Sequence, residues 1–469
     1  MRKEELKSRV LGAASGLFLT IPQIWMVAAP LQLIAFIPVL YLASKKDTTY
    51  GKMIYAGVYM GIFYVLPQVY VLRMPLIITL ILFAELILIF SIFSLLSYRL
   101  LHKPTLLSVF AVGALFVLLD WINFTAVPIW GMAQSIVRPW SAYPELISFV
   151  SLTGLTGIAF LIVSLQSLAV NAVVCPKKKR TYVAAAGVLL FAIALNIVLQ
   201  RTEPVEKVKV SAMGWTEDSN SIDYPKDANS LYAKLVKKAA QEDSKIVVSP
   251  ELGFYTGSGD ISQWLVNFQK IAKENNIALV IGVASENSNI AVIIGPDGEV
   301  LDDYTKTHLT PFEDYKKGDG KPVIVTIDGK KTGVMICHDD NFTDISRKYG
   351  RKEVSLIAVP TQDWSQVKNA HFQSSINRAI ESNYAVIRAC NNGISAIISP
   401  KGELIKKMDH LIEGSGIITG EVALYSCETI FSLLGHWPIV PCLILLLFYT
   451  AGEVRPRISF VKHRHGLNL

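Results

Sequence analysis

The chain has 469 residues, 51% of them hydrophobic, and a mean hydropathy of +0.39, which excludes an ordinary soluble protein. The formal net charge of +7 does not indicate nucleic-acid binding, because the basic residues gather in short loops between apolar segments. Residues 1–200 are apolar, whereas residues 203–425 carry most of the acids and turn residues. We therefore expect a membrane part and one soluble domain.

The apolar segments predict about eight transmembrane helices, because a hydrocarbon core of roughly 30 Å needs about 20 residues per helix. The boundaries of the first two are the least defined, since both segments are short. The segments lie at about 10–25, 27–43, 53–71, 76–97, 105–123, 153–174, 182–199 and 433–451.

Basic residues alternate between the loops and predict the orientation. Cytoplasmic loops collect Lys and Arg, which places both termini in the cytoplasm and residues 200–432 outside. The alternate loops hold only Arg73 and Arg138. The basic loops contain Arg2, Lys3, Lys7 and Arg9; Lys45, Lys46 and Lys52; Arg99 and Lys103; Lys177, Lys178, Lys179 and Arg180; and Arg455, Arg457, Lys462 and Arg464.

The outer loop after the fifth apolar segment is rich in aromatic residues. Asp120-Trp121 lies near the end of that segment, and Trp130 and Trp140 follow. Aromatic residues at this density are typical of a membrane interface. We expect this loop to form the mouth of a lipid-facing cavity, although Asp120 could be only a solvated helix end.

The soluble part alternates short strands with amphipathic helices, which predicts an α/β layered domain. Asp297-Gly298 and 400–402 are typical of hairpin turns. The five cysteines have no zinc or disulfide spacing, and no phosphate loop occurs, so we expect no metal and no cofactor. Strands are predicted at 208–213, 245–249, 277–283, 290–294, 323–327, 332–336, 354–359, 385–389 and 394–398, and helices near 225–241, 259–275, 341–350 and 366–382.

Three polar residues follow strands or strand-like runs in a chemically complete set. Glu251 ends one run, Lys306 lies in a turn-rich segment, and Cys337 ends another run. Each alone is more often a solvated or inert side chain. Together, the carboxylate can move the thiol proton, and the ammonium can stabilise a thiolate and a tetrahedral oxyanion. We therefore predict that Cys337 is a nucleophile.

The order Glu, Lys, Cys resembles the nitrilase superfamily, and the whole chain is similar to the bacterial apolipoprotein N-acyltransferases. The stretch from Tyr304 to Phe312 follows the family's Tyr-x-Lys-x-His-Leu-Val-Pro-Phe-Gly-Glu-Tyr motif. The segments 363–364, 378–381 and 386–395, and Asp120-Trp121 with Trp130 and Gln134, resemble further family elements. The resemblance implies an α-β-β-α sandwich between the seventh and eighth helices. The expected domains are residues 1–202, 203–430 and 431–469.

Three positions depart from the family pattern. In the simplest alignment Asp314 replaces a second active-site glutamate, and His338-Asp339 replaces a Tyr-Glu pair after the nucleophile. Asp314 and Asp339 could position Lys306 or polarise the cavity, or could be merely structural. These changes leave the chemistry intact and put the substrate in doubt.

The resemblance implies a membrane acyltransferase. Its acyl donor is a phospholipid, its intermediate a Cys337 thioester, and its acceptor the α-amine of a lipoprotein's diacylglyceryl-cysteine. The first alternative is a membrane-tethered amidase or nitrile hydrolase, in which water replaces the amine. The second is a catalytically silent lipoprotein-binding scaffold.

Overall fold

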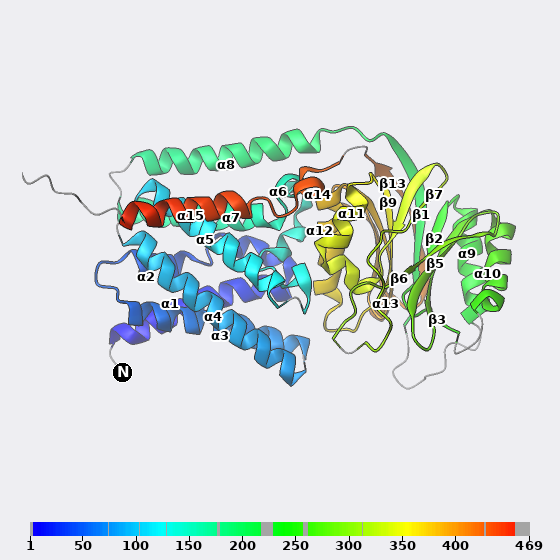
Figure 1. Cartoon of the computed structure of the whole chain (residues 1–469), viewed down its shortest axis with the longest axis horizontal. Helices are drawn as coiled ribbons and strands as arrows, with labels where there is room; N and C mark the ends of the chain where they lie inside the picture. The colour runs from blue at the N-terminus through cyan, green and yellow to red at the C-terminus, as the bar shows by residue number, and fades with distance from the viewer. Residues whose placement is uncertain are drawn as a thin grey trace, which may run out of the picture.

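The chain forms a helical bundle and a two-sheet domain that lie end to end along the long axis of the molecule (Figure 1). In the computed structural model, residues 3–73, 75–102, 104–127, 129–175, 179–216, 228–256, 261–311, 313–425 and 428–454 are described. Arg2, Lys103, Lys177, Lys178, Phe312 and the basic tail from residue 455 lie outside these ranges. So do the first residues of two predicted helices, at 225–227 and 259–260.

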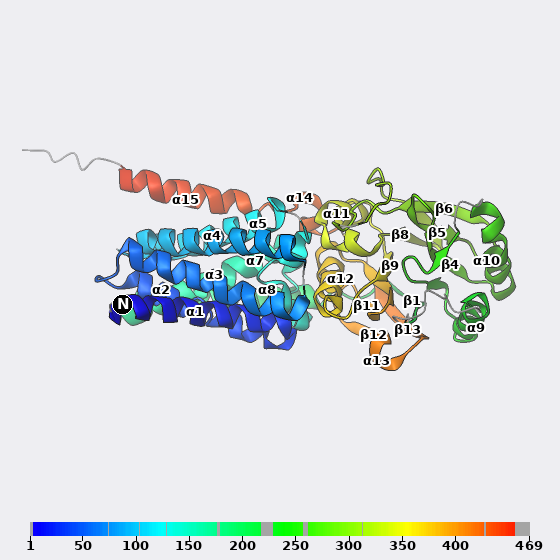
Figure 2. The same cartoon turned by 90° about the horizontal axis from the view of Figure 1, so that it is seen from below.

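The bundle consists of long apolar helices that run roughly parallel to one another (Figures 1 and 2). Small residues allow close packing: a Cβ at Gly12 would collide with the backbone of Ala56, and one at Gly57 would collide with that of Ser91. The elements are α1 (Lys3–Ile24), η1 (Met26–Leu33), α2 (Ile37–Ser44), α3 (Tyr50–Leu72), α4 (Leu76–Leu101), α5 (Leu106–Thr125), α7 (Leu155–Val174), α8 (Lys179–Gln200) and α15 (Ile439–Val454).

Helical structure is present at all eight predicted membrane segments. Six spans among the described residues are long and apolar enough to cross a membrane; η1 and α2 together make one of them. Two of the predicted segments, α1 and the shorter α15, are not among these six. The bundle is therefore confirmed as a multi-pass helical part, while the number of eight spans stays a prediction.

The aromatic outer loop is a packed structure of short helices: η2 (Gly131–Gln134), η3 (Arg138–Ala142), η4 (Pro144–Leu146) and α6 (Val150–Thr153). Asp120 is buried and is no solvated helix end. It accepts hydrogen bonds from Ser135 Oγ at 2.7 Å and from the Ile136 N–H at 3.0 Å. The side-chain amides of Gln23 in α1 and Gln32 in η1 donate to the Ile136 carbonyl. The loop is thereby fixed on the end of the bundle.

Two sheets stack face to face in the second part, the sandwich domain. The first sheet has the order β13-β1-β2-β4-β5-β6, with β3 beside β4, and the second has the order β12-β11-β10-β9-β8-β7. Their strands are β1 (Glu206–Gly214), β2 (Ile246–Val248), β3 (Phe254–Tyr255), β4 (Ala278–Ala284), β5 (Asn289–Ile294), β6 (Val300–Thr305), β7 (Ile324–Ile327), β8 (Lys330–Val334), β9 (Leu356–Gln362), β10 (Ala385–Asn391), β11 (Ile394–Ile398), β12 (Leu404–Asp409) and β13 (Gly416–Leu424).

Helices cover both outer faces of this pair of sheets, which confirms the expected α-β-β-α sandwich (Figure 2). The helices α9 (Ala228–Gln241) and α10 (Ile261–Asn275) cover the first sheet. The second sheet carries α11 (Thr343–Gly350) and α12 (Lys368–Ser382), which lie between it and the bundle. Apolar side chains of α11 and α12 join the bundle's core, so the layer next to the nucleophile touches the membrane part.

All nine predicted strands and four predicted helices are present, with ends shifted by a few residues. The two predicted hairpins are also present, with Gly298 and Gly402 at positive φ. Four strands were missed: β3, β6, β12 and β13. The short η5 (Cys337–Asn341), α13 (His410–Glu413) and α14 (Ile430–Leu434) complete the described elements.

Candidate active site

Cys337 lies at the start of η5, three residues after β8 ends, in a strained backbone conformation. Its backbone φ angle is +48°, in a region that residues other than glycine rarely adopt. The side chain is 5% exposed, and Sγ lies 3.6 Å from the carbonyl of Gln362 at the end of β9. Burial, and next the charge of Glu251, raise the pKa of the thiol well above its ordinary value. The resting cysteine is therefore a neutral thiol that needs a base.

Glu251 lies three residues after β2 and is fully engaged by hydrogen-bond donors. Its Oε1 accepts from Lys306 Nζ and from Asn289 Nδ2, both at 2.7 Å, and its Oε2 accepts from the Gln362 N–H at 2.9 Å. The side chain is only 2% exposed. The carbonyl of Gln362 accepts from the Cys337 thiol, and the N–H of the same residue donates to Glu251. Gln362 therefore links the candidate base to the candidate nucleophile.

Lys306 directly follows β6 and is completely buried between two carboxylates. Its Nζ lies 2.7 Å from Glu251 Oε1 and 2.6 Å from Glu313 Oε1. Burial alone would lower the pKa of this ammonium, but the charges of Glu251 and Glu313 outweigh it and raise the pKa above its ordinary value. The ammonium is therefore permanent and can stabilise negative charge on a reacting oxygen.

The second acid is Glu313, and the expectation that Asp314 takes this place is wrong. Asp314 is exposed, whereas Glu313 contacts Lys306 through Oε1 and accepts from the Thr310 N–H through Oε2 at 3.0 Å. The motif and this chain have the same number of residues from Tyr304 to Tyr315, but here the acid before the aligned position is the one whose side chain reaches Lys306.

Asp339 holds two segments together and does not contact Lys306. Its carboxylate accepts from the backbone N–H groups of Ile336 and His308, at 3.1 and 2.7 Å, and from the hydroxyl of Tyr304 at 2.9 Å. These bonds fix the lysine-bearing segment against the nucleophile turn. Of the two alternatives at this position, the contacts favour a structural role.

Both ring nitrogens of His338 are occupied. Nε2 lies 3.1 Å from the carbonyl of Ile129, in the outer loop, and Nδ1 lies 2.9 Å from Asn341 Nδ2. The ring meets Trp130 edge to face. Burial lowers the pKa of His338 well below its ordinary value. The residue is therefore a neutral bridge between the nucleophile turn and the bundle.

Cys337 and Glu251 face a cavity of about 440 Å³ that extends from the sandwich domain into the bundle, whereas the fully buried Lys306 does not line it. Cys337, Glu251 and Glu313 line one end. Apolar and amide side chains of the helices and side chains of the outer loop line the rest, and the loop's role as the mouth of a lipid-facing cavity stays a prediction. The bundle and loop contribute Gln23, Tyr64, Gln68, Leu72, Leu82, Leu86, Asn123, Trp130, Ala133, Gln134 and Arg138.

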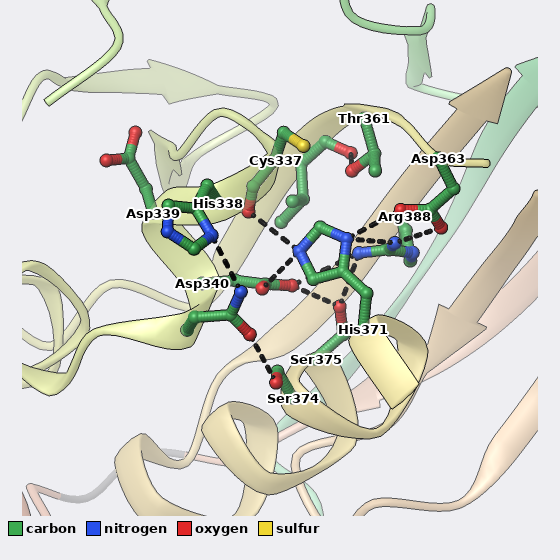
Figure 3. A network of polar contacts seen from close by, with 12 residues as sticks. Cys337, His338, Asp339, Asp340, Thr361, Asp363, His371, Ser374, Ser375 and Arg388 are labelled. Carbon is green, nitrogen blue, oxygen red and sulfur yellow. Dashed lines mark hydrogen bonds and ion pairs between the residues drawn. The ribbon is translucent and has the colours of Figure 1, made fainter. Parts of the chain in front are cut away.

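Sequence reasoning missed a buried polar network behind the nucleophile turn (Figure 3). It contains Asp340, Asp363, His371 and Arg388, and His371 also lines the cavity. Asp363 and Arg388 lie in the segments 363–364 and 386–395, which resemble family elements, but no contact of either with His371 or Asp340 was predicted. No described group of three or more His, Cys, Asp or Glu side chains is arranged to hold a metal ion.

Comparisons with known proteins show what this chain is similar to. A family model described as carbon-nitrogen hydrolase matches residues 226–430. The apolipoprotein N-acyltransferase of Haemophilus ducreyi is 25% identical over 74% of this chain and 76% of its own length. That of Geobacter metallireducens is 25% identical over 62% and 64%. An amidase from Nesterenkonia sp. is 19% identical, covers 46% of this chain and 90% of its own, and has a TM-score of 0.41. The chain is therefore similar over most of its length to the bacterial apolipoprotein N-acyltransferases, and it is a multi-pass membrane protein with a carbon-nitrogen hydrolase domain.

Proposed function

We propose that this protein moves an acyl chain from a phospholipid, through a thioester on Cys337, to the α-amine of a lipoprotein's diacylglyceryl-cysteine. The cavity carries this proposal, because one continuous space joins the buried thiol to helices that are apolar enough to lie in a membrane. A lipid ester can reach the thiol from the bilayer without crossing water. The names of the relatives support the same reaction.

In the first half-reaction, Glu251 takes the proton of Cys337, and the thiolate attacks the ester carbonyl carbon. A carbon–sulfur bond forms, and the carbonyl oxygen becomes an oxyanion held by Lys306 and by the backbone N–H of His338. The carbon–oxygen bond then breaks. Its electron pair goes to the lysophospholipid oxygen, which takes the proton back from Glu251.

In the second half-reaction, the α-amine of the acceptor attacks the thioester carbonyl. Glu251 accepts the amine's proton, the oxyanion returns to Lys306, and the carbon–sulfur bond breaks. The thiolate recovers its proton from Glu251, so the enzyme ends in its starting state. Water as second nucleophile would give a hydrolase, but the relatives' names favour acyl transfer over that alternative.

The proposed domains are residues 1–202 and 431–469 in the membrane and 203–430 outside it, with both termini in the cytoplasm. Alternating loop charge supports this orientation. Lys321→Cys, at a side chain that is 84% exposed, should react with a membrane-impermeant maleimide in intact cells. Its counterpart Lys46→Cys, exposed in the first basic loop, should react only after lysis. The reverse pattern would place the site on the wrong side for this substrate.

The reaction is tested with purified protein in detergent and a phospholipid that carries a labelled acyl chain. Label should remain on Cys337 until a diacylglyceryl peptide with a free α-amine is added. Cys337→Ala should remove it. Cys390→Ala is the matched control, because this buried thiol of the same domain does not line the cavity. Label released only as free fatty acid would indicate a hydrolase, and no reaction that depends on Cys337 would support the scaffold.

A further inference from the structure

Four charged side chains from separate elements meet in the buried network behind the nucleophile turn (Figure 3). Arg388 of β10 donates to Asp363 Oδ2 at 2.8 Å and to Asp340 Oδ2 at 3.2 Å. His371 of α12 lies between the same two acids. All four are at most 9% exposed. The cluster is electrically neutral only if His371 carries a positive charge, and a buried excess charge would be costly.

The oxygens around His371 require a proton on each ring nitrogen. Nδ1 is hydrogen-bonded to Asp363 Oδ1 at 2.7 Å, and Nε2 is hydrogen-bonded to the carbonyl oxygen of Cys337 at 3.2 Å. Both partners only accept hydrogen bonds. Arg388 Nη2 also lies 3.1 Å from Nδ1 and could donate to it if Nδ1 carried no proton. In that case the Nδ1 lone pair would face the closer Asp363 carboxylate, which is unfavourable. His371 is therefore an imidazolium.

This cation also reaches the backbone of the nucleophile. Nε2 of His371 lies 3.2 Å from the carbonyl oxygen of Cys337, to which it donates (Figure 3). That carbonyl belongs to the same peptide unit as the N–H of His338. Among the described residues, no hydrogen-bond partner of this N–H is found. A charged donor at one end of a peptide unit polarises the unit and strengthens the N–H at its other end as a donor.

We propose that His371 is a positioning residue that acts through the Cys337–His338 peptide on the oxyanion. It holds the strained cysteine backbone and makes the His338 N–H a stronger donor to the tetrahedral intermediate. The inference rests on the proposed thioester chemistry. Removal of a whole oxyanion donor costs about 10²–10³ in rate, so weakening one should cost about tenfold.

Two reactions of the same thiol separate this role from a merely structural one. Thioester formation from labelled phospholipid passes through an oxyanion, whereas alkylation of Cys337 by iodoacetamide does not. His371→Gln keeps an N–H near the Nε2 position without the charge, and His371→Asn removes the donor. Thioester formation should fall about tenfold in the first variant and further in the second, while the alkylation rate stays within about twofold of wild type.

Ser375→Ala is the matched control. Its hydroxyl donates to Asp340 in the same network at 2.5 Å but does not contact Cys337, so both rates should stay unchanged. Equal losses of acylation and alkylation in the His371 variants would show that the residue only supports the fold, and unchanged acylation would also overturn the proposal. Failure of wild-type protein to form a thioester would instead refute the proposed function.

Discussion

Replacing Glu313 should change the two reactions of the nucleophile in opposite directions. The buried site holds the carboxyl groups of Glu251 and Glu313, one ammonium and a neutral thiol, so it carries one excess negative charge when both carboxyl groups are ionised. This excess is unfavourable at Glu313, where burial and the charge of Glu251 raise the pKa against the effect of Lys306. Glu313→Gln removes that excess and keeps one oxygen, which can accept from Lys306, but its NH2 group then faces the Thr310 N–H that the second carboxylate oxygen had accepted. The expected cost in folding stability is about 1–3 kcal/mol, the value for a buried donor left without an acceptor.

The loss of this charge should make the thiol more acidic. After burial, the charges of Glu251 and Glu313 raise the pKa of Cys337, while Lys306 lowers it. A single nearby charge shifts a pKa by about one unit or more. Alkylation at neutral pH should therefore become about tenfold faster in Glu313→Gln. Acyl transfer should nevertheless fall, because Lys306 loses one of the two carboxylates that position it for the oxyanion.

The assay is iodoacetamide alkylation followed over a range of pH, with thioester formation measured in parallel. Asp314→Asn is the matched control, because it removes the same charge from an exposed neighbouring side chain. Its pH profile should match that of wild type. A larger shift in Asp314→Asn than in Glu313→Gln would refute our assignment of the second acid. Unchanged alkylation in Glu313→Gln would refute the charge argument.

Three further predictions concern the base, the imidazolium and the outer loop. Glu251→Gln should slow thioester formation at least about a hundredfold in single-turnover measurements, and a milder loss would remove Glu251 as general base. Burial and the charge of Arg388 lower the pKa of His371, but the charges of Asp340 and Asp363 outweigh them and raise it from 6.5 to about 9. The protonated His371 therefore contributes fully to folding stability below about pH 6.5, and this contribution is lost as the pH rises through about 9. Acylation should decline over the same alkaline range in wild type but not in His371→Asn; persistence of the decline in the variant would assign it to another group. Gly131→Ala, at φ +50°, would place a Cβ 2.6 Å from the Asn341 carbonyl oxygen and should slow thioester formation. Gly329→Ala, at φ +75° with no close neighbour, should only destabilise the fold by about 1–2 kcal/mol. Equal rates of thioester formation in the two variants would contradict this.

The sequence pattern predicted those strands that bury a continuous apolar face. Three of the four missed strands, β6, β12 and β13, are at sheet edges, and β3 has only two residues. β6 contains Asp302 and Asp303, and β12 contains Lys406 and Lys407, so neither has the pattern of a buried strand. Charged edge strands are expected physically because they discourage pairing with other chains. Local hydrophobicity cannot reveal them.

Glu251 and Cys337 could be predicted because each follows a recognisable strand-like run. Lys306 lies in a turn-rich segment after a missed strand and was singled out as the cation that completes the set. Glu313 was missed because a motif alignment does not show which of two neighbouring acids points toward Lys306. His371 was missed for a different reason: it lies 34 residues from Cys337, and the two meet only when α12 packs on η5. Such contacts between distant elements have no local pattern.

The departure at His338 changes the contact between the two halves of the protein. Because a backbone carbonyl only accepts, the bond to Ile129 requires a proton on Nε2, and the Asn341 amide then donates to Nδ1. Neither nitrogen is free to shuttle a proton in this arrangement. The ring instead fixes the nucleophile turn to the outer loop of the bundle, where Gly131 also approaches Asn341 closely. The sandwich domain carries the candidate reacting groups, and the strained turn at Cys337 is bonded to a loop of the bundle, so changes in that loop should alter the position of the candidate nucleophile.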